Sequence, residues 1–289
     1  MGKSKLLAVL MGASVLLAAC GGGNGSGSNA ATDGAASAAF APGGASAPQA
    51  SAQTACRPDG NFTYSGSAPQ VAANNGQLAV VVVPTLPAAY SKNRNMTVSN
   101  APASSQVQQT GGAFTTLASS AAATDCLGLA KGAVTEIQGV GSDVAIGRWN
   151  QAMDTDGNTY TFAQGIHYAV GTPLSLSATS GALACTQLIA DTVASDDSAA
   201  IGTLGTATAT LDLATRSLNN LSLPINLAGT QYALTNSQSP LNGISTTGQL
   251  SVQSVVVGHD ATKPLVAVGY SATLPNKEGI GGVVVLQCQ

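Results

Sequence analysis

The stretch Leu221-Ser222-Leu223-Pro224-Ile225-Asn226-Leu227 decides the fold class, because apolar and polar side chains alternate along it. Successive side chains of a β-strand point to opposite faces of the sheet, so this pattern predicts a strand with one buried and one solvated face. The same alternation occurs just upstream, at Ala207, Ala209, Leu211 and Leu213. We therefore expect a mainly β protein.

Further strand-like stretches lie on both sides of this pair. From residue 143 onward they recur at spacings of roughly 8–15 residues, a pattern typical of antiparallel sandwiches and barrels. A turn that contains Asp156-Gly157 favours a hairpin between the first two stretches. The expected strands are 143–149, 159–162, 166–170, 181–189, 203–213, 221–227, 231–235, 248–257, 265–272 and 281–287.

These strands predict a C-terminal antiparallel β-barrel of about eight strands over residues 141–289. Closure removes the exposed sheet edges and requires the last stretch, 281–287, to pair with an early one, expected at 143–149. Side chains would fill so small an interior, which leaves binding to rim loops such as 173–180 and 191–200. The second of these loops is acidic and serine-rich, and we expect it to be solvent-exposed.

Residues 55–140 predict a smaller mixed or β region before the barrel. The β-branched run Leu78-Ala79-Val80-Val81-Val82-Val83, closed by Pro84, predicts a buried strand. Residues 85–112 are expected to be mainly loop, and 114–127 to form a short helix. A further strand is expected at 132–140.

The first 19 residues have the features of a secretory signal peptide. Lys3 and Lys5 precede an apolar run, Leu6 to Ala19, that is shorter than the ~20 residues of a membrane span. The run ends Leu17-Ala18-Ala19-Cys20, which resembles the lipobox of bacterial lipoproteins at all four positions. The resemblance implies cleavage before Cys20 and attachment of fatty acid, such as palmitate, to the new N-terminus. The alternative is an ordinary signal peptide with an incidental cysteine.

Residues 20–54 predict a lipidated flexible tether, because they consist largely of Gly, Ser, Ala and Pro with hardly a charge. Gly21, rather than aspartate, follows the cysteine. In this respect the chain resembles lipoproteins that are sorted to the outer membrane. We expect a lipid-anchored protein of the bacterial outer membrane, on its periplasmic or its cell-surface face.

The four other cysteines are Cys56, Cys126, Cys185 and Cys288. An even number in an exported chain predicts two disulfides, and the wide spacing lacks the close pairs of a zinc site. Three pairings are possible. We prefer Cys56–Cys126 with Cys185–Cys288, since each bridge then stays within one half of the chain.

Composition and motifs argue against nucleic-acid binding and catalysis. Without the signal peptide the chain has 8 Lys+Arg against 13 Asp+Glu, and nucleic acid requires clustered cations. No phosphate-binding loop, zinc motif or serine-nucleophile elbow occurs, so we expect no enzyme, no metal and no cofactor. Asp154-Thr155-Asp156-Gly157-Asn158 begins like a calcium loop but lacks the later glycine and glutamate, so a hairpin turn is favoured.

A few single residues remain as candidates for chemistry. His259-Asp260 could be an acid–base pair, but adjacent residues on a strand face opposite ways, so structural or surface roles are favoured for His167 and His259. For the same reason we expect Trp149 in the core and Arg148 at the surface.

Two stretches resemble a known β-barrel family. The first is Ile146-Gly147-Arg148-Trp149 with Gly165-Ile166-His167-Tyr168-Ala169-Val170-Gly171-Thr172-Pro173. The second is Gly258-His259-Asp260-Ala261, then Val268-Gly269-Tyr270 and Ile280-Gly281-Gly282-Val283. Together they resemble the barrel domain of transferrin-binding-protein-B-like, solute-binding surface lipoproteins. The chain departs from that pattern at Lys263-Pro264 and in its final strand, and no ligand residue can be carried over.

The resemblance implies a binding lipoprotein that presents a barrel to a host protein or a small solute at the cell envelope. The alternative is a structural or envelope-maintenance lipoprotein without a ligand. A hydrolase is disfavoured because the sequence lacks a nucleophile paired with a base.

Overall fold

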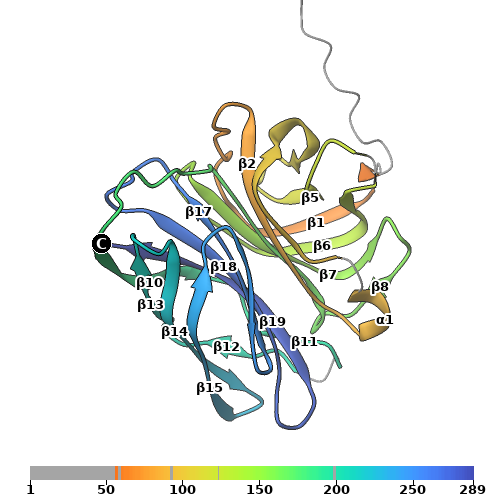
Figure 1. Cartoon of the computed structure of the whole chain (residues 1–289). Coiled ribbons are helices and arrows are strands. Elements are labelled where there is room, and N and C mark those ends of the chain that lie inside the picture. The colour runs from red at the N-terminus through yellow and green to blue at the C-terminus, as the bar shows by residue number, and fades with distance from the viewer. Residues whose placement is uncertain (1–55, 58–59, 92–93, 123, 198–199) are drawn as a thin grey trace, which may run out of the picture. The chain divides into compact units, whose positions relative to one another are not determined.

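The computed structural model describes residues 56–57, 60–91, 94–122, 124–197 and 200–289. The predicted signal peptide, Cys20 and the tether lie outside the described residues. The described part is mainly β and consists of two largely antiparallel sheets (Figure 1). We call them the N-terminal sheet, built from β1–β9, and the C-terminal sheet, built from β10–β19.

The N-terminal sheet has the valine-rich strand near one edge and the Trp149 strand near its centre. Its hydrogen-bonded order is β3 (Met96–Pro102), β2 (Gln77–Thr85), β9 (Gly165–Gly171), β7 (Val144–Asp154), β6 (Cys126–Val140), β5 (Phe114–Ala118) and β4 (Val107–Gln108). Two further strands pair with β6 and β7, respectively: β1 (Phe62–Gly66) and β8 (Thr159–Tyr160). The helix α1 (Ala88–Ser91) and the 3-10 turn η2 (Ala103–Ser105) flank β3.

The C-terminal sheet forms a curled path through β15 (Thr230–Pro240), β14 (Ser217–Leu227), β13 (Thr208–Asp212), β10 (Ala182–Ala190), β19 (Gly279–Cys288), β18 (Leu265–Thr273), β17 (Leu250–Val257) and β16 (Gly243–Thr247). Two short strands, β11 (Ala194–Ser195) and β12 (Thr203–Leu204), pair with β19 and β14. The curl brings β15 and β16 close, and Asn236 Nδ2 on β15 donates to Thr247 Oγ1 on β16 at 3.2 Å. Among the described residues, no backbone ladder joins these two strands.

The predicted closure of a barrel by residues 281–287 and 143–149 is wrong. β19 pairs with β10 and β18, whereas β7 pairs with β6 and β9. A strand has only two edges, and the valine run in β2 occupies the free edge of β9, so the strands before residue 171 complete a sheet of their own. The first sheet therefore takes strands from both sides of the boundary placed at residue 140.

Two local predictions upstream are also wrong. Residues 114–127, expected to be helical, contain β5 and the start of β6, because every residue of Phe114–Ala118 is buried and a strand can bury both faces. Residues 85–112, expected to be mainly loop, contain α1, β3 and β4.

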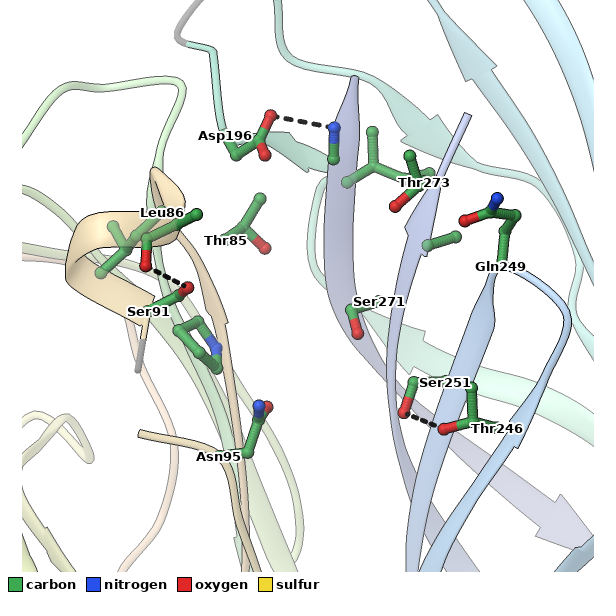
Figure 2. Close-up of a pocket in the computed structure, with 15 residues that line it drawn as sticks. Thr85, Leu86, Ser91, Asn95, Asp196, Thr246, Gln249, Ser251, Ser271 and Thr273 are labelled. Carbon is green, nitrogen blue, oxygen red and sulfur yellow. Dashed lines mark hydrogen bonds between the residues drawn. The ribbon is translucent and has the colours of Figure 1, made fainter. Parts of the chain in front are cut away.

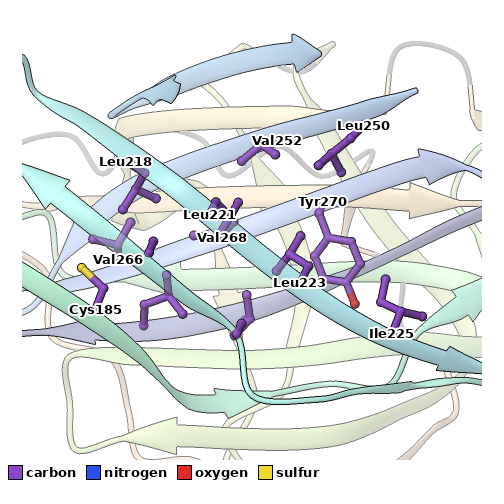
Figure 3. Packing of buried hydrophobic residues seen from close by; sticks show 14 of the residues in the cluster. Cys185, Leu218, Leu221, Leu223, Ile225, Leu250, Val252, Val266, Val268 and Tyr270 are labelled. Atoms are coloured by element: carbon purple, nitrogen blue, oxygen red, sulfur yellow. The ribbon is translucent and has the colours of Figure 1, made fainter. Parts of the chain in front are cut away.

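The alternating stretch 221–227 behaves as predicted. Its apolar residues Leu221, Leu223, Ile225 and Leu227 are buried. Figure 3 shows this face of β14 packed across the curl against Val252, Val266, Val268 and Tyr270 of β17 and β18. The structure also pairs Cys56 with Cys126 and Cys185 with Cys288, the pairing preferred from the sequence.

A separate apolar layer lies between the two sheets, and we call it the inter-sheet layer. It consists of Ala79, Val81, Val83, Val144, Ile146, Ala169, Val255, Val257, Leu265, Ala267, Val283 and Val285. Gly269 lets β18 approach β2 closely, because a Cβ at this position would lie 2.5 Å from Val83 Cγ2 and 2.6 Å from Val81 Cγ1.

We predict that Gly269→Ala destabilises the protein by about 1–3 kcal/mol, because the added methyl overpacks the inter-sheet layer. Gly111→Ala is the matched control, since nothing lies within 4 Å of a Cβ there. Urea unfolding monitored by tryptophan fluorescence measures both. Equal midpoints for the two variants would contradict this account of the layer.

Candidate functional site: a polar cleft between the sheets

A polar cleft opens at one end of the inter-sheet layer (Figure 2). It has a volume of about 280 Å³ and lies between β2–α1 on one side and β16–β19 on the other. Most of its lining side chains carry hydroxyl or amide groups: Thr85, Ser91, Asn95, Thr246, Gln249, Ser251, Ser271 and Thr273. Asp196 is the charged lining residue, and the described lining includes no Lys, Arg or aromatic side chain.

The cleft arises because inward-facing positions change from apolar to polar along each strand. On β2 the inward series Ala79, Val81, Val83 ends in Thr85, and on β18 Leu265, Ala267 and Gly269 are followed by Ser271. Backbone pairing places Ser251, Ser271 and Gly281 side by side across β17, β18 and β19. Alternation therefore carries hydroxyls into the space between the sheets where hydrocarbon would otherwise pack.

Thr85 is the most buried hydroxyl residue of the cleft. Thr85 is only 3% exposed, and its Oγ1 has no hydrogen-bond partner among the described residues. A Cβ on Gly281 would lie 2.3 Å from this oxygen, so the absence of a side chain at Gly281 makes room for the hydroxyl. Figure 2 shows the Thr85 hydroxyl turned toward β18 and β19. A buried hydroxyl without a partner costs free energy, which a bound polar group would offset.

Asp196 is held at the opposite wall by the backbone of Gly279. The Gly279 N–H donates to Asp196 Oδ1 at 2.9 Å, and the Asp196 N–H donates to the Gly279 carbonyl at 2.9 Å. Partial burial raises the pKa of Asp196; the Gly279 N–H opposes this rise, and the neighbouring carboxylates Asp197 and Glu278 add to it.

A buried ionic network lies next to the cleft in the N-terminal sheet. Arg148 is 2% exposed and donates from Nη2 to Glu136 Oε1 at 2.7 Å, while its Nη1 donates to the carbonyls of Phe162 and Gln164. The expectation that Arg148 lies at the surface is therefore wrong, whereas Trp149 is in the core as predicted. Both neighbours are buried because the two faces of β7 are both covered.

A β-bulge in β6 aims Glu136 at this network. The register between β6 and β7 shifts after Thr135, and Glu136 has a φ of 58°. Its carboxylate also accepts from the N–H and hydroxyl of Thr192, which ties the N-terminal sheet to the segment after β10. Burial alone would raise the pKa of Glu136, but Arg148 and the Thr192 N–H hold it below the ordinary value.

His167 and Asp191 form the second half of the network. His167 Nδ1 lies 2.5 Å from Asp191 Oδ2, and both side chains are fully buried. Asp191 Oδ1 accepts from the Val283 N–H at 2.8 Å, in the gap on β19 between the parts paired with β10 and β11. Asp191 was expected in a solvent loop, but here its carboxylate replaces a missing strand partner. Neither side chain is accessible to a substrate, so the pair is structural.

The other sequence candidates do not form a reactive centre. His259 Nδ1 is 2.7 Å from Asp143 Oδ1 rather than paired with Asp260, which accepts from Thr262 in its own turn. Asp154 accepts from the N–H groups of Asp156 and Asn158, as a hairpin turn requires. Within the described residues, no group of His, Cys, Asp or Glu could hold a metal ion.

Sequence reasoning missed the cleft residues Thr85 and Ser271. The available signal was hydroxyl residues at inward positions of strands that are otherwise apolar on that face. The loop 191–200, expected to bind ligand, contributes Asp196 to the cleft, whereas the described lining includes no residue of 173–180.

Comparison with protein-family models, curated proteins and solved structures gives no match to this chain. The likeness to transferrin-binding-protein-B-like lipoproteins therefore rests on the sequence motifs alone. The helices among the described residues include none with the length and hydropathy of a membrane span.

We predict that Glu136→Gln lowers the free energy of unfolding at pH 7 by on the order of 3 kcal/mol, because the buried Arg148 loses its counter-charge. The folded pKa of Glu136 is lowered, so its contribution is complete above the unfolded value of about 4.3 and is lost as the pH falls through the folded value. The variant should therefore lose less stability than the wild type between about pH 5 and pH 3. Parallel pH dependences in denaturant unfolding would refute this.

The exposed pair His259–Asp143 gives a second pH prediction. The hydrogen bond and charge of Asp143 raise the pKa of His259 above 6.5, so the bond is complete below that pH and is lost as the pH rises through the folded value. NMR titration of the His259 ring should give a pKa above 6.5 in the wild type and a lower one in Asp143→Asn. An identical titration in both proteins would show that the pair does not form in solution.

Proposed function

We propose that this chain is an exported, lipid-anchored binding protein of the bacterial outer membrane that holds a small polar solute in the cleft between its sheets. The observation that carries the proposal is the Thr85 hydroxyl. It has no hydrogen-bond partner among the described residues, belongs to a residue that is only 3% exposed, and lies at a cleft lined by hydroxyls and amides. Ligand pockets usually have volumes of about 300–1,000 Å³, and this cleft, at about 280 Å³, lies just below that range, which favours a small solute.

The lining chemistry favours a hydroxylated ligand. Serine and threonine hydroxyls both donate and accept, and the amides of Asn95 and Gln249 do the same, so the cleft can match hydroxyls in several orientations. A nucleophile next to an accessible base would be required for hydrolysis. Among the described residues, His167 on β9 pairs with Val83 of β2 but is fully buried against Asp191, so the proposal is binding without catalysis.

In this proposal Cys20 is the residue that attaches the protein to the membrane. The sequence Leu17-Ala18-Ala19-Cys20 supports acylation there, and the polar tether of residues 20–54 would separate the folded sheets from the membrane. Attachment through several acyl chains is stable because each buried CH₂ contributes about 0.8 kcal/mol.

We predict that Cys20→Ala abolishes lipid attachment. Mass spectrometry of the N-terminal peptide should find acyl chains on Cys20 of the wild-type protein and none on the variant, which should no longer remain in the outer-membrane fraction. The lipoprotein assignment would be overturned if the wild-type protein had no acyl chain on Cys20 and the variant were extracted from the membrane like the wild type. Protease treatment of intact cells then separates a cell-surface location from a periplasmic one.

Calorimetric titration of the detergent-extracted full chain tests the cleft, with glucose, glucosamine and glucuronate as probes of similar size. At least one probe should bind. Ser271→Leu should abolish this binding by filling the cleft, and Thr85→Val should weaken it by about fivefold or more through loss of one hydrogen bond. Thr230→Val, at an exposed site on β15, is the matched control. Wild-type affinity in Ser271→Leu, or no binding of any probe, would overturn the proposed function.

A further inference from the structure

The charged side chain in the described lining of the cleft is a carboxylate. It belongs to Asp196, and the carboxylates of Asp197 and Glu278 are close enough to raise the pKa of Asp196. The described lining residues include no cationic side chain to balance them. Field lines concentrate in a cleft with low-dielectric walls, so this arrangement attracts cations and repels anions.

The Asp196 carboxylate is positioned rather than merely nearby. Gly279 fixes one oxygen, Oδ1, through its N–H, and a Cβ on Gly279 would lie 2.3 Å from the other, Oδ2. A larger residue at position 279 would therefore displace the carboxylate. Among the described residues no hydrogen bond to Asp196 Oδ2 is found, which leaves this oxygen able to accept from a ligand.

Two buried polar atoms near Asp196 have no partner among the described residues. One is Thr85 Oγ1, and the other is Glu278 Oε1, in the turn that leads into β19. A ligand with an ammonium group and hydroxyls could supply donors to the Asp196 carboxylate and to Thr85 at the same time. A neutral polyol satisfies only the hydroxyl side of this cleft, and an anion meets a like charge.

We propose that the cleft selects a cationic hydroxylated solute, with its ammonium group bound by Asp196 and its hydroxyls bound by Thr85 and Ser271. The inference rests on the proposed function, because it names the class of solute that the same cleft binds. Charge-assisted hydrogen bonds are roughly twice as strong as neutral ones, so the ammonium group should dominate the selectivity.

The three probes used above test this selectivity at neutral pH and low salt. Glucosamine should bind on the order of tenfold tighter than glucose, and glucuronate should bind more weakly than either. The preference for glucosamine should fall as sodium chloride is raised, since salt screens a partly exposed charge.

Asp196→Asn should remove the preference for glucosamine, because the amide retains an acceptor for the Gly279 N–H but carries no charge to bind the ammonium group. Gly279→Ala should reduce the preference by displacing the carboxylate. Asp260→Asn, at an exposed turn, is the matched control and should bind like the wild type.

The outcomes separate this inference from the function on which it rests. Equal affinities for glucose and glucosamine, or tighter binding of glucuronate, would overturn the selectivity and leave the binding function in place. An unchanged preference in Asp196→Asn would show that another group binds the ammonium. Binding of none of the probes would overturn both proposals.

Discussion

The contact of β2 with β18 and β19 is the constraint on which the rest of this structure depends. β2 lies in the N-terminal sheet, β18 and β19 lie in the C-terminal sheet, and their inward side chains must fill one shared layer. Gly269 and Gly281 allow the close approach, because β2 side chains occupy the space that their Cβ atoms would need. The core of each sheet lies on its opposite face, and this layer is the apolar cluster that takes residues from both halves of the described chain.

The inter-sheet layer is apolar over most of its length and polar at one end. Both the buried ionic network and the polar cleft lie at this polar end. The buried part of this end contains two pairs of ionisable side chains, Arg148 with Glu136 and His167 with Asp191. Buried ion pairs contribute little net stability but penalise any arrangement that leaves one charge alone. They therefore fix the relative position of the sheets, and the cleft beside them keeps a defined shape.

The sequence predicted the strand content well because alternation is a local property. The burial of Leu221, Leu223, Ile225 and Leu227 follows from a period of two and needs no knowledge of their partners. Which strands pair is a non-local property. The valine run of β2 could not be assigned to β9 from the sequence, since a run that is apolar on both faces fits the centre of any sheet. The predicted barrel closure failed for this reason.

The candidate site was less predictable than the fold. Asp191 and Arg148 looked like surface residues by composition, and only their tertiary partners explain their burial. Thr85 and Ser271 were inconspicuous because isolated hydroxyl residues are common in strands of exported proteins. They form a candidate site because the two sheets meet at the polar end of the inter-sheet layer and bring both residues into one cleft.

Hydrogen–deuterium exchange of the full lipidated chain in detergent, with and without saturating glucosamine, tests the location of binding most directly. We predict slower exchange of the amides in residues 84–91 and 271–280, which border the cleft, and no change in the rim loop 173–180. Slower exchange confined to 173–180, or unchanged exchange around the cleft at saturation, would contradict the assignment of the ligand to the space between the sheets.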